Sequence, residues 1–153
     1  NISLFRDEFQ DKEIEESTEK SMISGEIEKM KNGINTIIGE RGIDLSGGQK
    51  QRVVISRAFL NKSNIVIFDD TFSALDNKTE KLLLENIKEL VKDKTCIIIS
   101  NRISDIKDAN HIVVLDNGKI IEQGKHNDLI KNKGLYNKFY NQQSSKTEDS
   151  ILN

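Results

Sequence analysis

The chain has 153 residues, of which 35% are apolar and 31% charged, and it contains neither Trp nor Pro. This length suits one ordinary domain, and the composition favours a helix-rich α/β protein. The net charge of -2 gives no reason to expect nucleic-acid binding. No apolar run approaches the roughly 20 residues of a membrane helix, and the first residues do not resemble a secretory signal. Because the sequence opens on Asn1 rather than Met, we expect it to be part of a longer chain.

The first 45 residues predict a small helical region followed by a loop. Residues 7–32 are dense in Glu and Lys and carry apolar residues at helical spacing, which predicts one or two amphipathic helices. Those apolar residues are Ile14, Met22, Ile23, Ile27 and Met30. An irregular stretch, residues 34–45, connects them to the next element.

The segment SGGQKQRVVISRAFL predicts a helix that begins with Ser46 as its N-cap. Gly47 and Gly48 leave the first backbone N–H groups unobstructed at the positive end of the helix dipole. This pattern indicates a phosphate-sized anion site, to which Gln49 and Arg52 would add donors. The alternative is a flexible loop that happens to precede a helix. The expected buried face of the helix consists of Val53, Val54, Ala58 and Phe59.

Two short, unbroken, β-branched runs, residues 64–68 and 95–99, are typical of strands covered on both faces in a parallel sheet. Leu and Ile at helical spacing over 77–92 predict a crossover helix between them. Cys96 lies in the second run, which favours a buried hydrophobe over a catalytic thiol.

The last third of the sequence predicts a hairpin and two helices. Residues 111–124 contain two alternating segments joined by Asp116-Asn117-Gly118, a strong hairpin signal. Helices are expected over 126–131 and 135–142. From residue 143 the sequence has no pattern, which predicts a disordered tail.

Two adjacent acids, Asp69 and Asp70, end the first apolar run. An acid at the carboxyl end of a buried parallel strand lies where open α/β sheets place their ligands, and there it can hold Mg²⁺. A second acid beside it can orient or deprotonate an attacking water. The alternative is that the pair merely caps a strand or forms a turn.

These motifs together resemble an ABC ATPase domain of the exporter type. Leu45–Arg52 (LSGGQKQR) is similar to the ABC signature, Ile65–Asp69 to a Walker B strand, Ser73–Asp76 (SALD) to a D-loop, Thr36–Gly42 (TIIGERG) to the exporter segment before the signature, and residues 101–130 to the switch region and C-terminal hairpin. The order and spacing match over roughly residues 1–142. The resemblance implies a P-loop NTPase type of parallel sheet with flanking helices and a small helical subdomain, incomplete at its N-terminus.

The resemblance implies that the chain is part of the nucleotide-binding domain of an ATP-driven exporter. This domain would lie at the cytoplasmic face of the cell membrane. Such domains form head-to-tail dimers that sandwich ATP, so the partner would be a second ABC ATPase domain. Asp69 would hold Mg²⁺ through water, and Thr36–Gly42 would contact a transmembrane domain. Asp76 would help to couple the two sites. The residues that would face the partner's ATP are Ser46, Gly47, Gly48 and Gln49, and the D-loop residues are Ser73, Ala74, Leu75 and Asp76.

The sequence departs from the family pattern in three ways. No G-x-x-x-x-G-K-[ST] occurs in it and the Q-loop is missing, so we expect this chain not to hold ATP alone. Asp70 stands where Glu is usual, which draws the carboxylate back by about 1.5 Å, and a general base must approach within about 3 Å of its water. Asn101 replaces the switch His and cannot carry a positive charge. Both changes fall in one site, which points to the degenerate subunit of a heterodimeric exporter.

Two alternatives stay open at this point. A non-transport ABC ATPase, of the chromosome-maintenance or translation-factor kind, would share the signature and the Walker B strand. A truncated, non-catalytic dimerisation module would share the fold without the reaction. The expected organisation is a helical subdomain and loop over 1–45, the motif-bearing part over 46–142 and a tail over 143–153.

Overall fold

A computed structural model describes residues 2–3, 9–39 and 44–149 of the chain, with side chains described up to residue 145. The chain divides into two compact units, residues 1–99 and 100–153, and each is described by itself. The expected segments 1–45 and 46–142 follow motifs rather than compact units, and they remain predictions.

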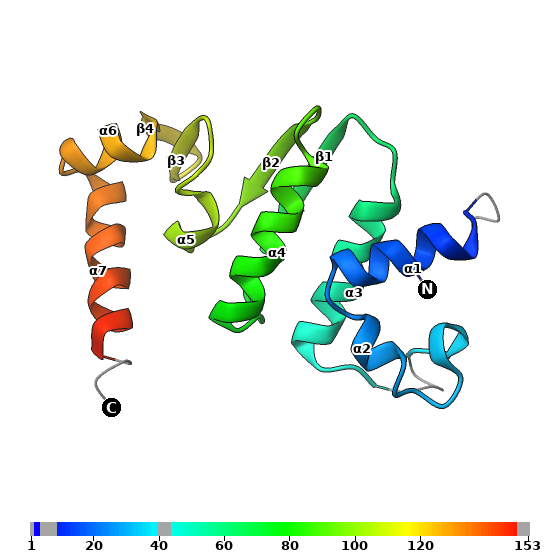
Figure 1. Cartoon of the computed structure of the whole chain (residues 1–153). Coiled ribbons are helices and arrows are strands. Elements are labelled where there is room, and N and C mark those ends of the chain that lie inside the picture. Colours follow the sequence, from blue (N-terminus) through cyan, green and yellow to red (C-terminus); the bar gives the residue numbers. More distant parts are fainter. Residues whose placement is uncertain (1, 4–8, 40–43, 150–153) are drawn as a thin grey trace. The chain divides into compact units, whose positions relative to one another are not determined.

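The first unit begins with a small helical region. It contains α1 (Asp11–Lys20), α2 (Ser24–Ile27) and a 3-10 turn, η1 (Gly33–Asn35) (Figure 1). The Gln10 backbone N–H donates to Glu13 Oε2 at 2.9 Å, which satisfies one of the orphan donors at the start of α1. Residues 7–32 were predicted to form one or two amphipathic helices, and two, α1 and α2, form in the described part of this range. Their apolar core consists of Ile2, Ile23, Leu45, Val53 and Leu60.

Helix α3 (Gly47–Leu60) joins this helical region to the sheet. Val53 packs into the helical core, whereas Ile55 packs into the core beneath the strands. Val54, expected on the buried face, is 49% exposed instead. Successive helical residues point about 100° apart. Because Val53 and Ile55 both pack inward, Val54, which lies between them in the sequence, points to the opposite side of the helix.

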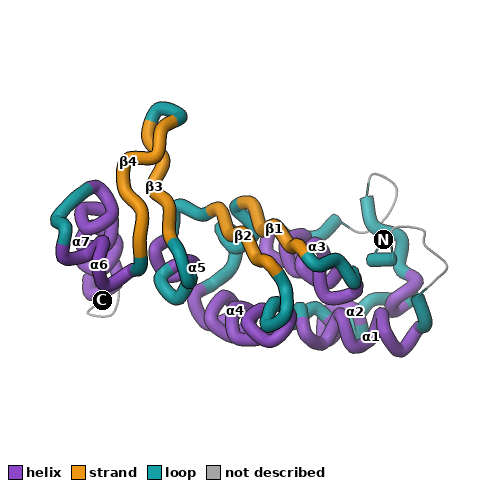
Figure 2. Tube along the Cα trace, turned by 90° about the horizontal axis from the view of Figure 1, so that it is seen from above, coloured by secondary structure: helices purple, strands orange, loops and turns teal. Residues whose placement is uncertain are grey.

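The strands β1 (Ile65–Asp69) and β2 (Thr95–Ile99) pair in parallel, with Ile65 opposite Thr95 and Asp69 opposite Ile99. Helix α4 (Asn77–Leu90) makes the crossover, as the sequence predicted, and lies along the strands (Figures 1 and 2). The core under this sheet consists of Ile55, Val66, Phe68, Phe72, Leu75, Leu83 and Ile87. Cys96 is half-buried against this core, and burial raises the pKa of its thiol, in keeping with a packing role.

The expectation that both strands are covered on both faces is wrong for the described residues. Val66 and Phe68 point into the core, but the alternate residues Ile65 and Ile67 are each 60% exposed. Ile97 and Ile99 on β2 are likewise exposed, at 45% and 53%. An unbroken apolar run shows that both faces are apolar, but it does not reveal what covers them.

The second unit is built on an antiparallel hairpin, β3 (Ile112–Asp116) and β4 (Lys119–Gly124). Asn117 and Gly118 both have positive φ, 48° and 75°, as the predicted two-residue turn requires. Short helices α5 (Ile103–Ile106) and α6 (His126–Lys131) flank the hairpin. The core consists of Ile103, Ile112, Leu129 and Tyr136.

Helix α7 (Leu135–Asp149) corrects the prediction of a structureless tail from residue 143. The helix continues through residues 143–149, although these carry no apolar periodicity. Its first turn is held by β4, because Glu122 Oε1 accepts the backbone N–H groups of Leu135 and Tyr136 at 2.5 and 3.2 Å. The rest of the predicted tail, 150–153, lies outside the described residues.

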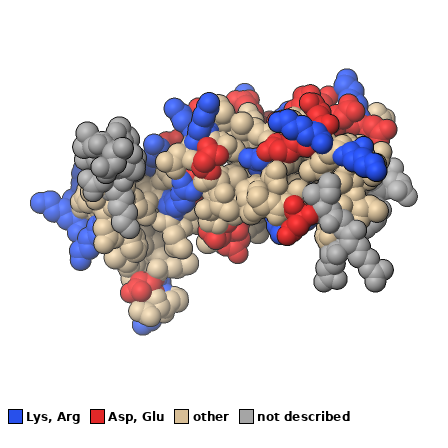
Figure 3. All heavy atoms as spheres, turned by 90° about the horizontal axis from the view of Figure 1, so that it is seen from below, with Lys and Arg blue, Asp and Glu red and all other residues tan. Residues whose placement is uncertain are grey.

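The surface of the described part carries charges of both signs. On the face drawn in Figure 3, acidic and basic side chains lie close to one another over much of the area. No helix in the described part is both long and apolar enough to span a bilayer.

Candidate functional site

The N-terminus of α3 has the geometry of an anion site. Ser46 caps the helix: its Oγ accepts the Gln49 N–H at 3.3 Å, and Gln49 Oε1 accepts the Ser46 N–H at 2.9 Å. The hydroxyl of Ser46 acts here as an acceptor and can still donate its proton. The N–H groups of Gly47 and Gly48 belong to the first turn, where the helix supplies no acceptor. These donors lie at the positive end of the helix dipole.

An open pocket of about 420 Å³ lies at this helix end, which we call the α3 pocket. It is lined by Ser46–Gln49, Arg52 and Ala74–Asp76. A Cβ on Gly48 would stand 3.0 Å from the Ala74 carbonyl oxygen, and one on Gly47 would stand 3.3 Å from Ala74 Cβ. The two glycines therefore have a second role besides exposing N–H groups, because they let the loop after β1 approach the helix.

Arg52 and Gln49 are already engaged within the chain. The Arg52 guanidinium donates to Glu26 of α2, and its side chain is only 13% exposed. The amide oxygen of Gln49 accepts the Ser46 N–H as part of the helix cap. The donors toward an anion in the α3 pocket are therefore chiefly the Ser46 hydroxyl and the backbone N–H groups of the two glycines.

Asp69, the last residue of β1, and Asp70, which follows it, are both exposed at the carboxyl end of the parallel pair. Asp70 has φ +46°, in the left-handed region, and its N–H donates to the Ile99 carbonyl at 2.9 Å. The described residues contain no group of three or more His, Cys, Asp or Glu that could hold a metal ion by themselves. An exposed strand-end carboxylate does fit Mg²⁺, which keeps several waters and binds through one or two carboxylates together with substrate phosphates.

The D-loop residues Ser73–Asp76 run from this turn to α4. Ser73 Oγ donates to the Asp70 carbonyl at 3.1 Å. Asp76 is the N-cap of α4, since its Oδ1 accepts the N–H groups of Lys78 and Thr79 at 3.1 and 3.0 Å. The hydrogen bond from the Thr79 backbone is the main cause that holds the pKa of Asp76 below its ordinary value of 3.8. Asp76 thus has a structural task in addition to the coupling role the resemblance implies.

Asn101 belongs to the second unit and is described there by itself. It is exposed, and its carbonyl accepts Gln143 Nε2 at 2.8 Å. The same amide of Gln143 accepts the Ile103 N–H through Oε1 at 2.9 Å. Beside it, Ser100 Oγ donates to the buried carboxylate of Asp105 at 2.5 Å. The loop that presents Asn101 is therefore fixed at several points.

Sequence reasoning missed two glutamines that organise the site. Gln143 was assigned to a tail, and no local pattern links it to residues about 40 positions earlier. Gln51 lies within the signature stretch, but its amide contacts reach the D-loop instead of an anion. The presence of a second Gln in the signature stretch was a signal that could have pointed to Gln51. For Gln143 the sequence contains no such signal.

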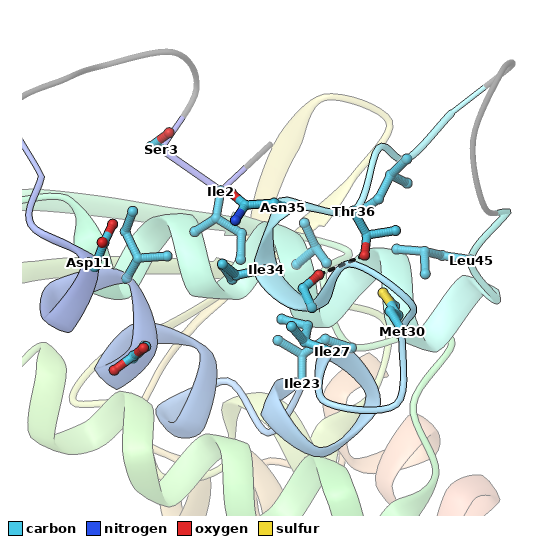
Figure 4. A pocket seen from close by; sticks show the side chains of 15 residues that line it. Ile2, Ser3, Asp11, Ile23, Ile27, Met30, Ile34, Asn35, Thr36 and Leu45 are labelled. Carbon is cyan, nitrogen blue, oxygen red and sulfur yellow. Dashed lines mark hydrogen bonds between the residues drawn. The ribbon is translucent and has the colours of Figure 1, made fainter.

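A second hollow, of about 300 Å³, lies in the helical region (Figure 4). Its walls are mixed: Ile23, Ile27, Met30 and Leu45 are apolar, whereas Asp11, Glu15, Asn35 and Thr36 add polar or charged groups. Thr36 Oγ1 is tied to the Gly33 carbonyl at 2.7 Å. Of the exporter-type segment Thr36–Gly42, residues 36–39 are described and contribute Thr36 and Ile38 to this hollow; residues 40–42 lie outside the described residues.

Comparisons with known proteins agree with these motifs. The family model described as ABC transporter matches residues 2–73. The ATP-dependent lipid A-core flippase of Escherichia coli is 42% identical over 94% of the chain, and the leukotoxin export ATP-binding protein of Aggregatibacter actinomycetemcomitans is 47% identical over 72% of it. The chain spans only 25% and 16% of those two proteins.

A solved bacterial Atm1-family ABC exporter with ATP bound superposes with a TM-score of 0.87 and 38% sequence identity. The match covers 94% of this chain and 25% of the exporter's. The fold is therefore that of an ABC-type P-loop NTPase, as predicted. The chain belongs to the ABC transporter ATPase family, and the relatives named here are exporters.

Proposed function

We propose that the chain is an ATP-binding part of an ABC exporter, coupling ATP binding and hydrolysis at a dimer interface to export of a substrate across a membrane. The observation that carries this proposal is the α3 pocket, where the capped helix end lies against the D-loop. The names of the relatives, a lipid A-core flippase and a leukotoxin export protein, support export over a non-transport ATPase.

In this proposal the anion of the α3 pocket is the terminal phosphate of an ATP bound by a second ABC ATPase domain. The Ser46 hydroxyl and the N–H groups of Gly47 and Gly48 donate to it. Gln49 supports them by holding the cap. Asp69 holds Mg²⁺ through water in the chain's own site, where the ion neutralises phosphate charge.

The chain's own site is proposed to be degenerate. Asp70 reaches a methylene less far than Glu toward an attacking water, and Asn101 offers an amide in place of an imidazole. The signature in the α3 pocket, which serves the other site, retains the Ser46 hydroxyl and the N–H groups of Gly47 and Gly48 as donors. This asymmetry supports a heterodimer in which the partner subunit differs, and in which most hydrolysis occurs at the site completed by Ser46–Gln49.

The remaining partner is proposed to be a transmembrane domain at the cytoplasmic face of the membrane. The hollow beside Thr36 has about the volume of a ligand-binding pocket. We also propose that the 153-residue chain does not hold ATP on its own, because it contains no phosphate-cradling G-x-x-x-x-G-K-[ST].

The test uses Ser46→Arg in the full transporter assembled with its partner subunit. A bulky cation should fill the α3 pocket and block the phosphate, so ATP hydrolysis should fall at least about a hundredfold, as when an oxyanion donor is lost. Ser63→Arg is the matched control, since Ser63 is exposed in the loop before β1. Hydrolysis that persists in Ser46→Arg would contradict signature donation to the partner's site.

A further inference from the structure

The amide of Gln51 bridges two elements of the first unit. Gln51 lies one turn into α3, and its Oε1 accepts the Ala74 N–H at 2.9 Å. Its Nε2 donates to Ser73 Oγ at 3.0 Å and approaches the Asp70 carbonyl at 3.4 Å. One side chain of the signature helix thus contacts both the turn after β1 and the start of the D-loop.

The backbone that Gln51 contacts is irregular and needs external support. Asp70 is left-handed, with φ +46°, and a non-glycine residue rarely adopts this conformation without compensating contacts. From Asp70 to Ala74 the chain is neither helix nor strand. Within it, Phe72 is 1% exposed and anchors the segment in the core, whereas Ser73 and Ala74 lie at the surface.

The α3 glycines support the same loop from another direction. Ala74 packs closely on Gly48, because a Cβ added to Gly48 would stand 3.0 Å from the Ala74 carbonyl oxygen. Gln51 then fixes the N–H of this same residue. Ala74 is therefore located on both its N–H and its C=O sides by residues of α3.

We propose that Gln51 is a positioning residue that holds the D-loop in register with the signature helix, so that the chain's two nucleotide-facing parts move together. One part is Asp70, in the chain's own site, and the other is Ser46–Gly48, in the site completed for the partner; this assignment rests on the proposed function. All three hydrogen bonds are made by the one amide of Gln51, so in this proposal a shift at Asp70 is passed to α3 through a single side chain.

The chemistry of an amide explains why Gln suits this task. The loop presents a donor, the Ala74 N–H, next to acceptors at Ser73 and Asp70, and the Gln amide offers an acceptor oxygen and a donor nitrogen at the end of one flexible arm. Glu could accept from Ala74 but could not donate, and Leu could do neither. Because Ser73 and Ala74 are exposed, water can replace the lost bonds, so removal of the amide should loosen the loop while changing global stability little.

The first arm of the test needs no nucleotide. Hydrogen–deuterium exchange is followed at residues 70–76 in the full-length chain assembled with its partner subunit, for the wild type, Gln51→Leu and Gln51→Glu. We expect exchange at Ala74 to accelerate roughly tenfold in Gln51→Leu, the effect of losing one ordinary hydrogen bond. Gln51→Glu, which keeps the acceptor, should restore much of the protection. Gln142→Leu on α7, another exposed Gln→Leu change on a helix, controls for the substitution itself.

The second arm separates positioning from binding through steady-state ATP hydrolysis. Gln51→Leu leaves the Ser46 cap intact, so KM should stay within about twofold while kcat falls roughly ten- to a hundredfold, the pattern of misplacement rather than lost binding. The kcat of Gln51→Glu should lie between those of the wild type and Gln51→Leu. Unchanged exchange at Ala74 in Gln51→Leu, or a raised KM with unchanged kcat, would overturn the proposal. If the wild type neither binds nor hydrolyses ATP, the proposed function and the coupling fail together, while the exchange arm still decides whether Gln51 holds the loop.

Discussion

Asp70 shows how one residue combines backbone and chemical constraints. Its left-handed φ of +46° suits Asp, which adopts that region several-fold more readily than most non-glycine residues. A Glu at this position would gain reach but lose that tolerance, at a cost of up to about 1 kcal/mol. The turn is held by a backbone hydrogen bond to Ile99 and by the contacts of Ser73 and Gln51, so the short carboxylate is presented from a fixed position.

A first prediction concerns the pair of departures from the family pattern. In the full transporter, Asp70→Glu combined with Asn101→His should raise ATP turnover at the chain's own site, because a longer base and an imidazole are restored together. General acid–base groups contribute about 10²–10⁴-fold, so even partial restoration is measurable as single-turnover hydrolysis. Asp70→Ala with Asn101→His is the control without a base and should gain nothing. An unchanged rate in the Glu/His variant would mean that another feature silences the site.

A second prediction concerns Asp76 and acid. Its pKa is lowered in the folded chain, chiefly by the Thr79 backbone N–H, so the folded state favours the carboxylate. The contribution of this cap to stability is therefore present above pH 3.8 and is lost as the pH falls through the lower, folded-state pKa. Asp76→Asn keeps a capping oxygen without a titrating charge, and Asp76→Ala has neither.

Thermal unfolding from pH 7 to pH 2 would check this point. The difference in Tm between wild type and Asp76→Ala should be largest near neutral pH and should shrink in acid, whereas Asp76→Asn should keep an offset from Asp76→Ala throughout. A wild type whose advantage over Asp76→Ala grows on acidification would contradict the cap as the cause.

At the scale of elements, local sequence signals predicted the helices and turns well. They did not predict the contacts between residues that are distant in the sequence. The cap at Ser46, the crossover helix after Asp76 and the turn at Asn117-Gly118 all depend on residues within a few positions of one another, and each element forms where its signal lies. Helix α7 was underestimated because residues 143–149 are polar and lack apolar periodicity. Its support comes from Glu122 and from contacts of Gln143 with the Asn101 loop, which no local pattern reveals.

A third prediction follows for α7. Glu122 accepts two N–H groups at its start, and a Cβ at Gly134 would overlap the Glu122 carboxylate, so this corner is built around that side chain. Glu122→Ala should lower the free energy of unfolding by about 1 kcal/mol, the usual value of a lost cap. Glu122→Gln keeps an acceptor and should retain most of it. Urea unfolding measures both, and equal losses in the two variants would show that the negative charge, and not the hydrogen bonding, matters.

At the scale of the whole molecule, the residues specify the parts of a nucleotide site more completely than its assembly. In the first unit the D-loop lies against the start of α3, and Gln51 links both to Asp70; the roles that the motifs assign to these residues stay predictions. The motifs did not predict that one face of the sheet is exposed, the face that carries Ile65, Ile67, Ile97 and Ile99. An apolar run shows that a strand has two apolar faces, but it does not show which element covers each face. The chain spans a quarter or less of the curated relatives described above.

The central claim is that two unequal ATP sites form, one degenerate and one completed by this chain's signature. The most direct measurement is the nucleotide content of the assembled transporter after one turnover with Mg-ATP. We expect ATP to persist in the site built from Asp69 and Asp70, while ADP accumulates in the site completed by Ser46–Gln49. Equal conversion to ADP in both sites, at the same rate, would contradict it.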